Sequence, residues 1–337
     1  LTYANSNSTD PTTSSRTVRV TVSDGDGGTS SQSDITVQVT PVNDAPTLSA
    51  TGASVTYSEG DSAVDLFSGV SVGTVESGQT IPALTLTVAN LSDGSSEQLS
   101  LDGSTIDLTN GNAVTTTTNG LSVTVTVSAG TATVTVTKTG GISSATAQSV
   151  VDGLTYQNAS DSPTAGNRVI TLTSVADNGG TANGGVDTSV LSVATTVTVG
   201  AVNDAPTITA PASVSVTEDA ATAVTGISFS DVDAGGSSVT ATFSVPSGSL
   251  AATSGGGVTV SGSGTGTLTL SGSITNINAF IAGSNLSFTT ASNAASNVTL
   301  TVSIDDGGNT GADPGLSGTA SSEAASTTVT LAVSAVN

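Results

Sequence analysis

The chain lacks several residue types, and each absence excludes a class of function. Its 337 residues include no Cys, His, Met or Trp. Without Cys there can be no disulfide, no thiolate nucleophile and no thiolate metal site. Without His the common nucleophile–base triads cannot form, so we expect no enzyme. Aromatic residues make up only 2% of the chain, which makes a carbohydrate site a weak hypothesis because sugar-binding sites commonly use exposed aromatic rings.

Basic residues and long apolar runs are scarce as well. There are 4 Lys and Arg against 26 Asp and Glu, which gives a formal net charge of -22. Such a chain repels the phosphates of nucleic acids and of anionic lipids, and it attracts cations. No apolar run approaches the ~18 residues of a membrane-spanning helix. We therefore expect no nucleic-acid partner and no membrane insertion.

Ser, Thr, Val, Gly and Ala dominate the composition, which favours short strands and tight turns. Residues 17–22 alternate apolar and polar side chains with the period of a half-buried strand, and similar stretches recur along the chain. The pattern predicts an all-β fold of tandem antiparallel β-sandwiches joined end to end. Two apolar clusters at helical spacing predict a short helix over the end of each complete sandwich. They are Ile142, Ala145, Val150 and Val151, and Ile274, Ile277, Phe280 and Ile281.

One motif divides the chain into repeats. The segment Val42-Asn43-Asp44-Ala45-Pro46-Thr47-Leu48 returns as Val202-Asn203-Asp204-Ala205-Pro206-Thr207-Ile208, and Ala335-Val336-Asn337 begins a third copy. Proline favours an extended conformation in the residue before it, so we interpret the motif as a stiff linker that carries oxygen ligands. The expected domains are residues 1–42, the closing part of one repeat, and the complete repeats 43–202 and 203–337. Because the chain has no Met, we interpret it as a piece of a longer protein.

Acidic residues from distant loops are predicted to meet at the second linker. In a seven-stranded up-and-down sandwich, successive loops alternate between the two ends. The loops that would gather there follow the first and fifth strands of the middle repeat and the second and sixth strands of the third repeat. Their acidic residues and the linker itself supply Glu59, Asp161, Asn203, Asp204, Asp231, Asp233, Asp305 and Asp306. Ca²⁺ takes 6–8 oxygen ligands and Zn²⁺ would require His or Cys, so this set predicts calcium.

These motifs resemble bacterial cadherin-like tandem repeats. The resemblance is carried by the Val-Asn-Asp-Ala-Pro linkers, by Asp231-Val232-Asp233, by the acidic Gly-Gly loops and by Leu-x-Tyr strands such as Leu154-Thr155-Tyr156. It implies cadherin-like or immunoglobulin-like sandwiches with calcium held between successive repeats. The ligands that it implies are Glu59, Asp161, Asn203, Asp204, Asp231 and Asp233, with Asp305 from the sixth loop.

The first linker departs from this pattern. The middle repeat has Val70-Ser71-Val72-Gly73 where the resemblance implies Asp-x-Asp. The candidate ligands there are Asp10, Asn43, Asp44 and Asp177, with Glu76 as a further candidate. We expect a weaker calcium site at this linker, or none.

The resemblance implies a stalk segment of a large secreted or cell-surface bacterial protein, stiffened by calcium and supporting adhesion. Its expected partners are neighbouring repeats or identical chains, and any surface ligand would bind through other regions of the protein. The alternative is a subunit of a self-assembling extracellular filament or matrix. In that case a neighbouring chain would complete residues 1–42, which lack the opening strands of a sandwich.

Overall fold

The computed structural model describes residues 1–7, 9–309, 311–312 and 322–336. The chain forms two compact units. The first consists of Leu1–Tyr57, Asp61–Ala159 and Gly166–Val199, and the second of Ser58–Gly60, Ser160–Ala165 and Gly200–Asn337. The second unit therefore takes in two short segments that lie within the expected middle repeat. The repeat boundaries expected after residues 42 and 202 stay a prediction.

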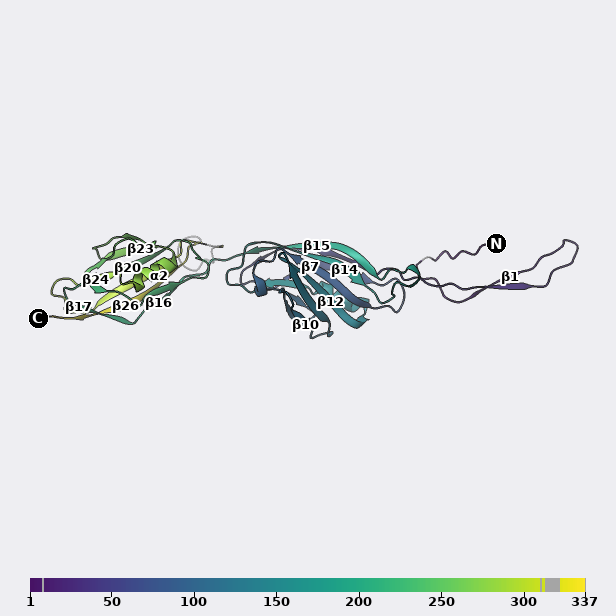
Figure 1. Ribbon diagram of the computed structural model, residues 1–337, viewed down its shortest axis with the longest axis horizontal. Helices are drawn as coiled ribbons and strands as arrows, with labels where there is room; N and C mark the ends of the chain where they lie inside the picture. The colour runs from purple at the N-terminus through teal and green to yellow at the C-terminus, as the bar shows by residue number, and fades with distance from the viewer. Residues whose placement is uncertain (8, 310, 313–321, 337) are drawn as a thin grey trace. The chain divides into compact units, whose positions relative to one another are not determined.

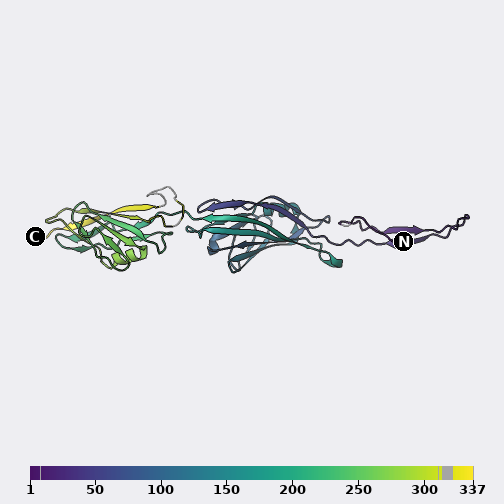
Figure 2. The same cartoon turned by 90° about the horizontal axis from the view of Figure 1, so that it is seen from above.

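A seven-stranded sheet forms one layer of the first unit (Figures 1 and 2). In order across the sheet, its strands are β10 (Ala113–Thr115), β11 (Ser122–Ser128), β12 (Thr131–Ile142), β7 (Ile81–Ala89), β14 (Gly166–Ala176), β15 (Thr188–Gly200) and β4 (Ser54–Ser58). The neighbours from β10 to β15 pair antiparallel. Because side chains alternate between the faces of a strand, Leu86 and Val134 pair on the buried face while Thr87 and Thr133 pair on the other.

Shorter strands complete the first sandwich. A four-stranded sheet contains β5 (Val64–Asp65), β13 (Thr155–Asn158), β8 (Glu97–Leu101) and β9 (Ser104–Asp107), and β3 (Thr47–Gly52) pairs with β6 (Phe67–Gly73). Leu86, Leu99 and Tyr156 are fully buried in one core that joins these layers. The 3-10 turns η1 (Gly94–Ser96) and η2 (Ala182–Gly184) lie in loops of this unit.

The N-terminal residues form a separate two-stranded sheet of β1 (Arg16–Val20) and β2 (Ser33–Val37). The strands pair antiparallel, with Val18 opposite Ile35 and Arg19 opposite Asp34. Every residue of β2 except Val37 is exposed, and Ile35 retains 52% of its accessible surface. This hairpin therefore has little burial of its own.

The described residues of the second unit form their own core and three sheets. The largest contains β17 (Ser213–Thr217), β26 (Ala324–Ser334), β25 (Val298–Asp305), β20 (Val239–Ser244), β23 (Thr267–Gly272) and β22 (Thr259–Ser261). The others contain β18 (Thr222–Ala223), β24 (Ser287–Thr289) and β21 (Ser249–Ala251), and β16 (Thr207–Thr209) with β19 (Ser228–Ser230). Phe243, Phe288 and Leu300 are fully buried in this core.

The structure confirms the all-β fold. One pairing differs from the antiparallel pattern, since β17 pairs with β26 in parallel. These two strands can pair in parallel because most of the second sandwich lies between them in sequence and supplies the long connection that parallel pairing requires.

The two predicted helices are also present, as α1 (Ser144–Asp152) and α2 (Ile274–Ala282). Each begins after a serine whose hydroxyl accepts a hydrogen bond from a backbone N–H of the first turn, Ser143 for α1 and Ser273 for α2. Figure 1 shows α2 beside the strands of the second unit, and its Ile277, Phe280 and Ile281 side chains are buried. In the described part of the chain, no helix has the length and apolarity needed to cross a membrane.

Candidate cation sites at the two linkers

The second linker is held in place by hydrogen bonds to loops of the second unit. The Asn203 side chain is 1% exposed, and its Nδ2 donates to Asp306 Oδ2 at 2.7 Å. The backbone amide of Asp204 donates to Asp233 Oδ2 at 2.7 Å. Pro206 is buried in the same segment. Asn203 and Asp204 therefore lie against the loops that follow β25 and β19.

The loop after β19 presents a carboxylate oxygen that lacks a hydrogen bond. Asp231 Oδ1 accepts hydrogen bonds from the backbone amides of Asp233 and Ala234, at 2.8 Å each, and these bonds fix the turn. The other oxygen, Asp231 Oδ2, is buried and has no hydrogen-bond partner. Burying such an atom is unfavourable unless something satisfies it, so this oxygen is available to a ligand.

Glu59 joins the second linker through the backbone. Its amide donates to Gly200 O, and its Oε2 accepts from the amide of Val202, both at 3.0 Å. The same arrangement recurs at Glu218, whose amide donates to Ser334 O and whose Oε2 accepts from Val336 N, again at 3.0 Å. The third linker copy extends to Asn337, which lies outside the described residues.

Neighbouring carboxylates raise the pKa values of two acids at the second linker, Glu59 and Asp204. The pKa of Glu59 is raised above its ordinary value because the carboxyl is partly buried, and the charges of Asp204, Asp233 and Asp161 raise it further, against a lowering by the hydrogen bond from Val202 N. Burial likewise raises the pKa of Asp204, with added contributions from Asp233, Asp161 and Asp231. Asp161 is exposed yet close enough to act on both groups. All five carboxylates belong to the second unit, and a bound cation would offset their repulsion.

Two acids open the sixth loop, and the structure gives them different partners. Asp306 is fully buried and accepts the hydrogen bond from Asn203. Asp305 is the last residue of β25, and its Oδ1 accepts from the Gly307 amide and the Ser322 hydroxyl. The role of Asp305 as a calcium ligand stays a prediction.

Glu323 is a further buried acid that the sequence reasoning missed. It is fully buried, and its amide donates to Asp306 Oδ1 at 2.9 Å while its carbonyl accepts from the Asp306 amide at 3.1 Å. An acid directly before the final strand of the repeat was the available signal. No local pattern relates Glu323 to Asp306, which lies 17 positions earlier in the sequence.

The first linker repeats the same hydrogen bonds with other residues. Asn43 Nδ2 donates to Asp177 Oδ1 at 2.9 Å, as Asn203 does to Asp306. The amide of Asp44 donates to Glu76 Oε1 at 2.9 Å, as that of Asp204 does to Asp233. Glu76 thus supplies the acceptor that the missing Asp-x-Asp would have provided. Gln79, which was not predicted, donates from Nε2 to Asn43 Oδ1 at 2.5 Å.

Four buried oxygens at the first linker have no hydrogen-bond partner. Three are carboxylate atoms and one is an amide oxygen: Asp44 Oδ2, Glu76 Oε2, Asp177 Oδ2 and Gln79 Oε1. Asp177 as a whole is 4% exposed. Asp10, the remaining candidate, is exposed, and its backbone amide and carbonyl bond to the side chain of Asn7.

Both linkers offer the donors that calcium prefers. Carboxylate and amide oxygens suit Ca²⁺, and the partnerless buried oxygens of Asp231 and Asp177 fit a ligand role. Within the described ranges, however, no three Asp or Glu residues are grouped so that they could hold a metal ion as they stand. Calcium binding would therefore have to draw these side chains together and recruit carbonyls or water.

The solved structures that are similar to this chain include cadherin fragments, at low sequence identity and low TM-score. No protein-family model matches the chain. No curated protein matches it either. Among solved structures, mouse Protocadherin-24 EC1-3 is 16% identical, with 95% of this chain and 80% of that chain covered and a TM-score of 0.31. Human CDH23 EC21-23 is 14% identical, with 83% and 67% covered and a TM-score of 0.29.

A third similar structure, Drosophila N-cadherin EC1-3, is 10% identical, with 90% of this chain and 73% of that chain covered and a TM-score of 0.22. Similarity at these TM-scores carries no argument about function. The all-β fold rests on the sheets themselves.

Proposed function

We propose that the chain is a stalk segment of a large secreted or cell-surface bacterial protein, that calcium bound at its linkers stiffens the tandem β-sandwich repeats, and that the stalk supports adhesion. The observation that carries this proposal is the buried Asp231 Oδ2, which has no hydrogen-bond partner and lies in the loop whose Asp233 binds the linker amide of Asp204. The raised pKa values of Glu59 and Asp204, to which neighbouring carboxylates contribute, are a second support.

Stiffening would arise because one cation would bind side chains from segments that are joined by short stretches of chain. Glu59 directly follows β4 and Asp161 is the third residue after β13, whereas Asp204 and Asp233 belong to the linker and the loop after β19. A cation that binds all four side chains would remove the freedom of the short segments between them. The chain's partners would be neighbouring repeats or identical chains, outside the cell, and the protein would have no catalytic role.

Removal of calcium tests this function. Thermal unfolding and small-angle X-ray scattering of the full chain should be measured with calcium and after chelation. We expect chelation to lower the unfolding temperature and to shorten the mean end-to-end distance as the linkers become flexible. If both quantities are unchanged by chelation, the calcium-stiffened stalk is wrong.

A second candidate function is favoured by the exposed β1–β2 sheet. In the first unit, the related strands β14 and β15 have neighbours on both sides, namely β7 and β4. Strands from a neighbouring chain could flank β1 and β2 in the same way, which would make the protein a subunit of an extracellular filament or matrix. Concentration-dependent fibres that are seen by electron microscopy and lost on deletion of residues 1–42 would support assembly. Fibres that persist after the deletion would contradict it.

A further inference from the structure

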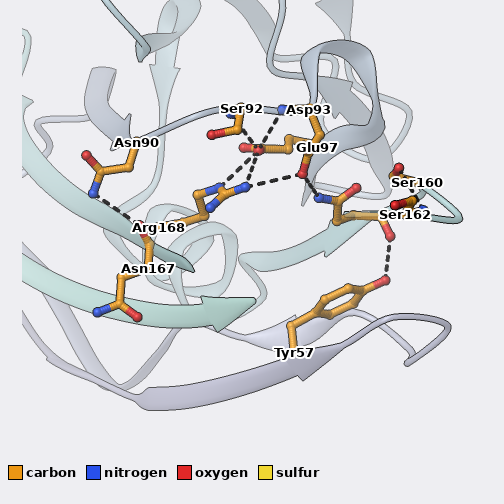
Figure 3. A network of polar contacts seen from close by, with 10 residues as sticks. Tyr57, Asn90, Ser92, Asp93, Glu97, Ser160, Ser162, Asn167 and Arg168 are labelled. Carbon is orange, nitrogen blue, oxygen red and sulfur yellow. Dashed lines mark hydrogen bonds and ion pairs between the residues drawn. The ribbon is translucent and has the colours of Figure 1, made fainter. Parts of the chain in front are cut away.

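One of the four basic residues of the chain is buried. The Arg168 side chain in β14 is 2% exposed, and its guanidinium lies 2.8 Å from Glu97 Oε1 and 3.2 Å from Asp93 Oδ2. The Glu97 and Asp93 side chains are 0% and 8% exposed. Figure 3 shows Glu97 between Arg168 and the Ser92–Asp93 turn, whose two amides donate to Glu97 Oε1 at 3.0 and 3.2 Å. We call Arg168, Glu97 and Asp93 the buried ion cluster.

Fold stability alone does not explain this cluster. Taking charges out of water costs several kcal/mol per ion, and apolar residues of similar volume are often as stabilising. Glu97 Oε2 remains buried without a hydrogen-bond partner in the cluster. At the corresponding positions of the second unit, Val298 takes the inward position at the start of β25 and Phe288 takes the aromatic position of Tyr156, so apolar side chains serve there.

Hydrogen bonds connect the buried ion cluster to the two loops that carry predicted calcium ligands. Asp93 Oδ2 accepts from Asn158 Nδ2, and Asn158 O accepts from the Tyr57 hydroxyl, both at 2.6 Å. Asn158 is the last residue of β13, and Tyr57 is the residue before the last in β4. In addition, the Ala159 amide donates to Ser96 O at 2.8 Å, next to Glu97.

The chain leaves the first unit directly after these anchored residues. Tyr57 is followed by the segment Ser58–Gly60, and Ala159 by Ser160–Ala165. These segments contain Glu59 and Asp161. The ends of β4 and β13 are both hydrogen-bonded to one buried charge cluster, so the points from which the two acid-bearing segments start depend on it.

We propose that the buried ion cluster is a positioning device that fixes the ends of β4 and β13 and so limits the movement of the two segments that carry Glu59 and Asp161. The inference rests on the proposed calcium site, but its effect on the two loops can be measured in calcium-free protein. Its members would not touch the cation, and they would act through Asn158 and Tyr57.

The test replaces the three charges by neutral side chains of similar shape, in the variant Arg168→Met/Glu97→Gln/Asp93→Asn of the full chain. The matched control is Arg19→Met/Asp34→Asn, which removes the exposed pair between β1 and β2, with its 3.1 Å contact. Tyr57→Phe removes only the hydroxyl that bonds to Asn158 and introduces no buried charge. If the triple variant does not fold, Tyr57→Phe is used as the test variant in its place.

Three quantities are measured: amide hydrogen exchange at Glu59 and Ala159 without calcium, calcium affinity by titration calorimetry, and the unfolding temperature. We expect the triple variant to exchange roughly 10-fold faster at both amides and to bind calcium about 10-fold more weakly, since the loss of an outer support of a metal site costs about 10–100-fold. For Tyr57→Phe we expect the two exchange rates to rise and the calcium affinity to fall, each about 3-fold. A change of this size lies within the free energy of one lost hydrogen bond. The control should match the unsubstituted protein.

The outcomes separate the two proposals. If exchange and affinity are unaltered, or if they change only in proportion to a fall in global stability, the positioning role is wrong. If the unsubstituted protein binds no calcium but the two amides respond as expected, the proposed function fails and the positioning role stands.

Discussion

Neutralising Asp233 should have little effect on stability without calcium and a large effect with calcium. Asp233 is 6% exposed and accepts the Asp204 amide, and its charge raises the pKa values of Glu59 and Asp204. In Asp233→Asn without calcium, relief of one close repulsion contributes about 1 kcal/mol. Weakening of the hydrogen bond from Asp204 costs about 1 kcal/mol, so the two effects nearly cancel.

With calcium the balance changes. Calcium at about 100 times its dissociation constant stabilises the folded state by roughly 2.7 kcal/mol. For a unit of this size, that free energy corresponds to a rise in unfolding temperature of about 5–10 °C. Loss of the Asp233 charge should remove most of that rise, because a carboxylate ligand has become a neutral amide.

Differential scanning calorimetry of the full chain checks this prediction, with calcium and with chelator. Asp65→Asn is the matched control, since Asp65 is an exposed acid in β5, in the first unit. The reasoning is refuted if calcium raises the unfolding temperature of Asp233→Asn as much as that of the unsubstituted protein. A large destabilisation in chelator would also refute it, because the side chain would then be structural rather than a cation ligand.

Three further perturbations test other parts of the structure. The pKa of Tyr156 is raised above its ordinary value of 10.0 by burial and by the charge of Glu97, so the folded state keeps a proton that the unfolded chain releases. The free energy of unfolding should therefore be unaffected by this group below pH 10.0 and fall as the pH rises beyond it, which denaturant titrations at a series of pH values would show. Ser273→Ala removes the N-cap of α2 and should cost about 1 kcal/mol, whereas Ser273→Asp should retain most of the stability; chemical denaturation measures both. In Gly179→Ala the new Cβ would overlap Asn43 Oδ1, so we expect a loss of about 1–3 kcal/mol and faster proteolysis at the first linker, while Gly236→Ala, which meets open space, should have little effect.

The secondary structure could be predicted from the sequence because its signals are local. The strands follow from alternation of Val and Thr, and α2 follows from apolar residues at helical spacing after Ser273. The parallel pairing of β17 with β26 could not be read in the same way, because it depends on which edge the last strand reaches. The Arg168–Glu97 pair spans 71 positions, and no local pattern relates the two residues.

The two linkers show why a motif predicts a site only in part. At both, the amide of the linker Asp donates to an acidic side chain, but that acid is Asp233 at one and Glu76 at the other. Glu has one more methylene than Asp, so it can reach the same amide from a different backbone position. The geometry is therefore kept while the Asp-x-Asp motif is lost. The first linker, which the motif alone marks as deficient, repeats both side-chain hydrogen bonds of the second, from the linker Asn to an Asp and from the linker Asp amide to an acid.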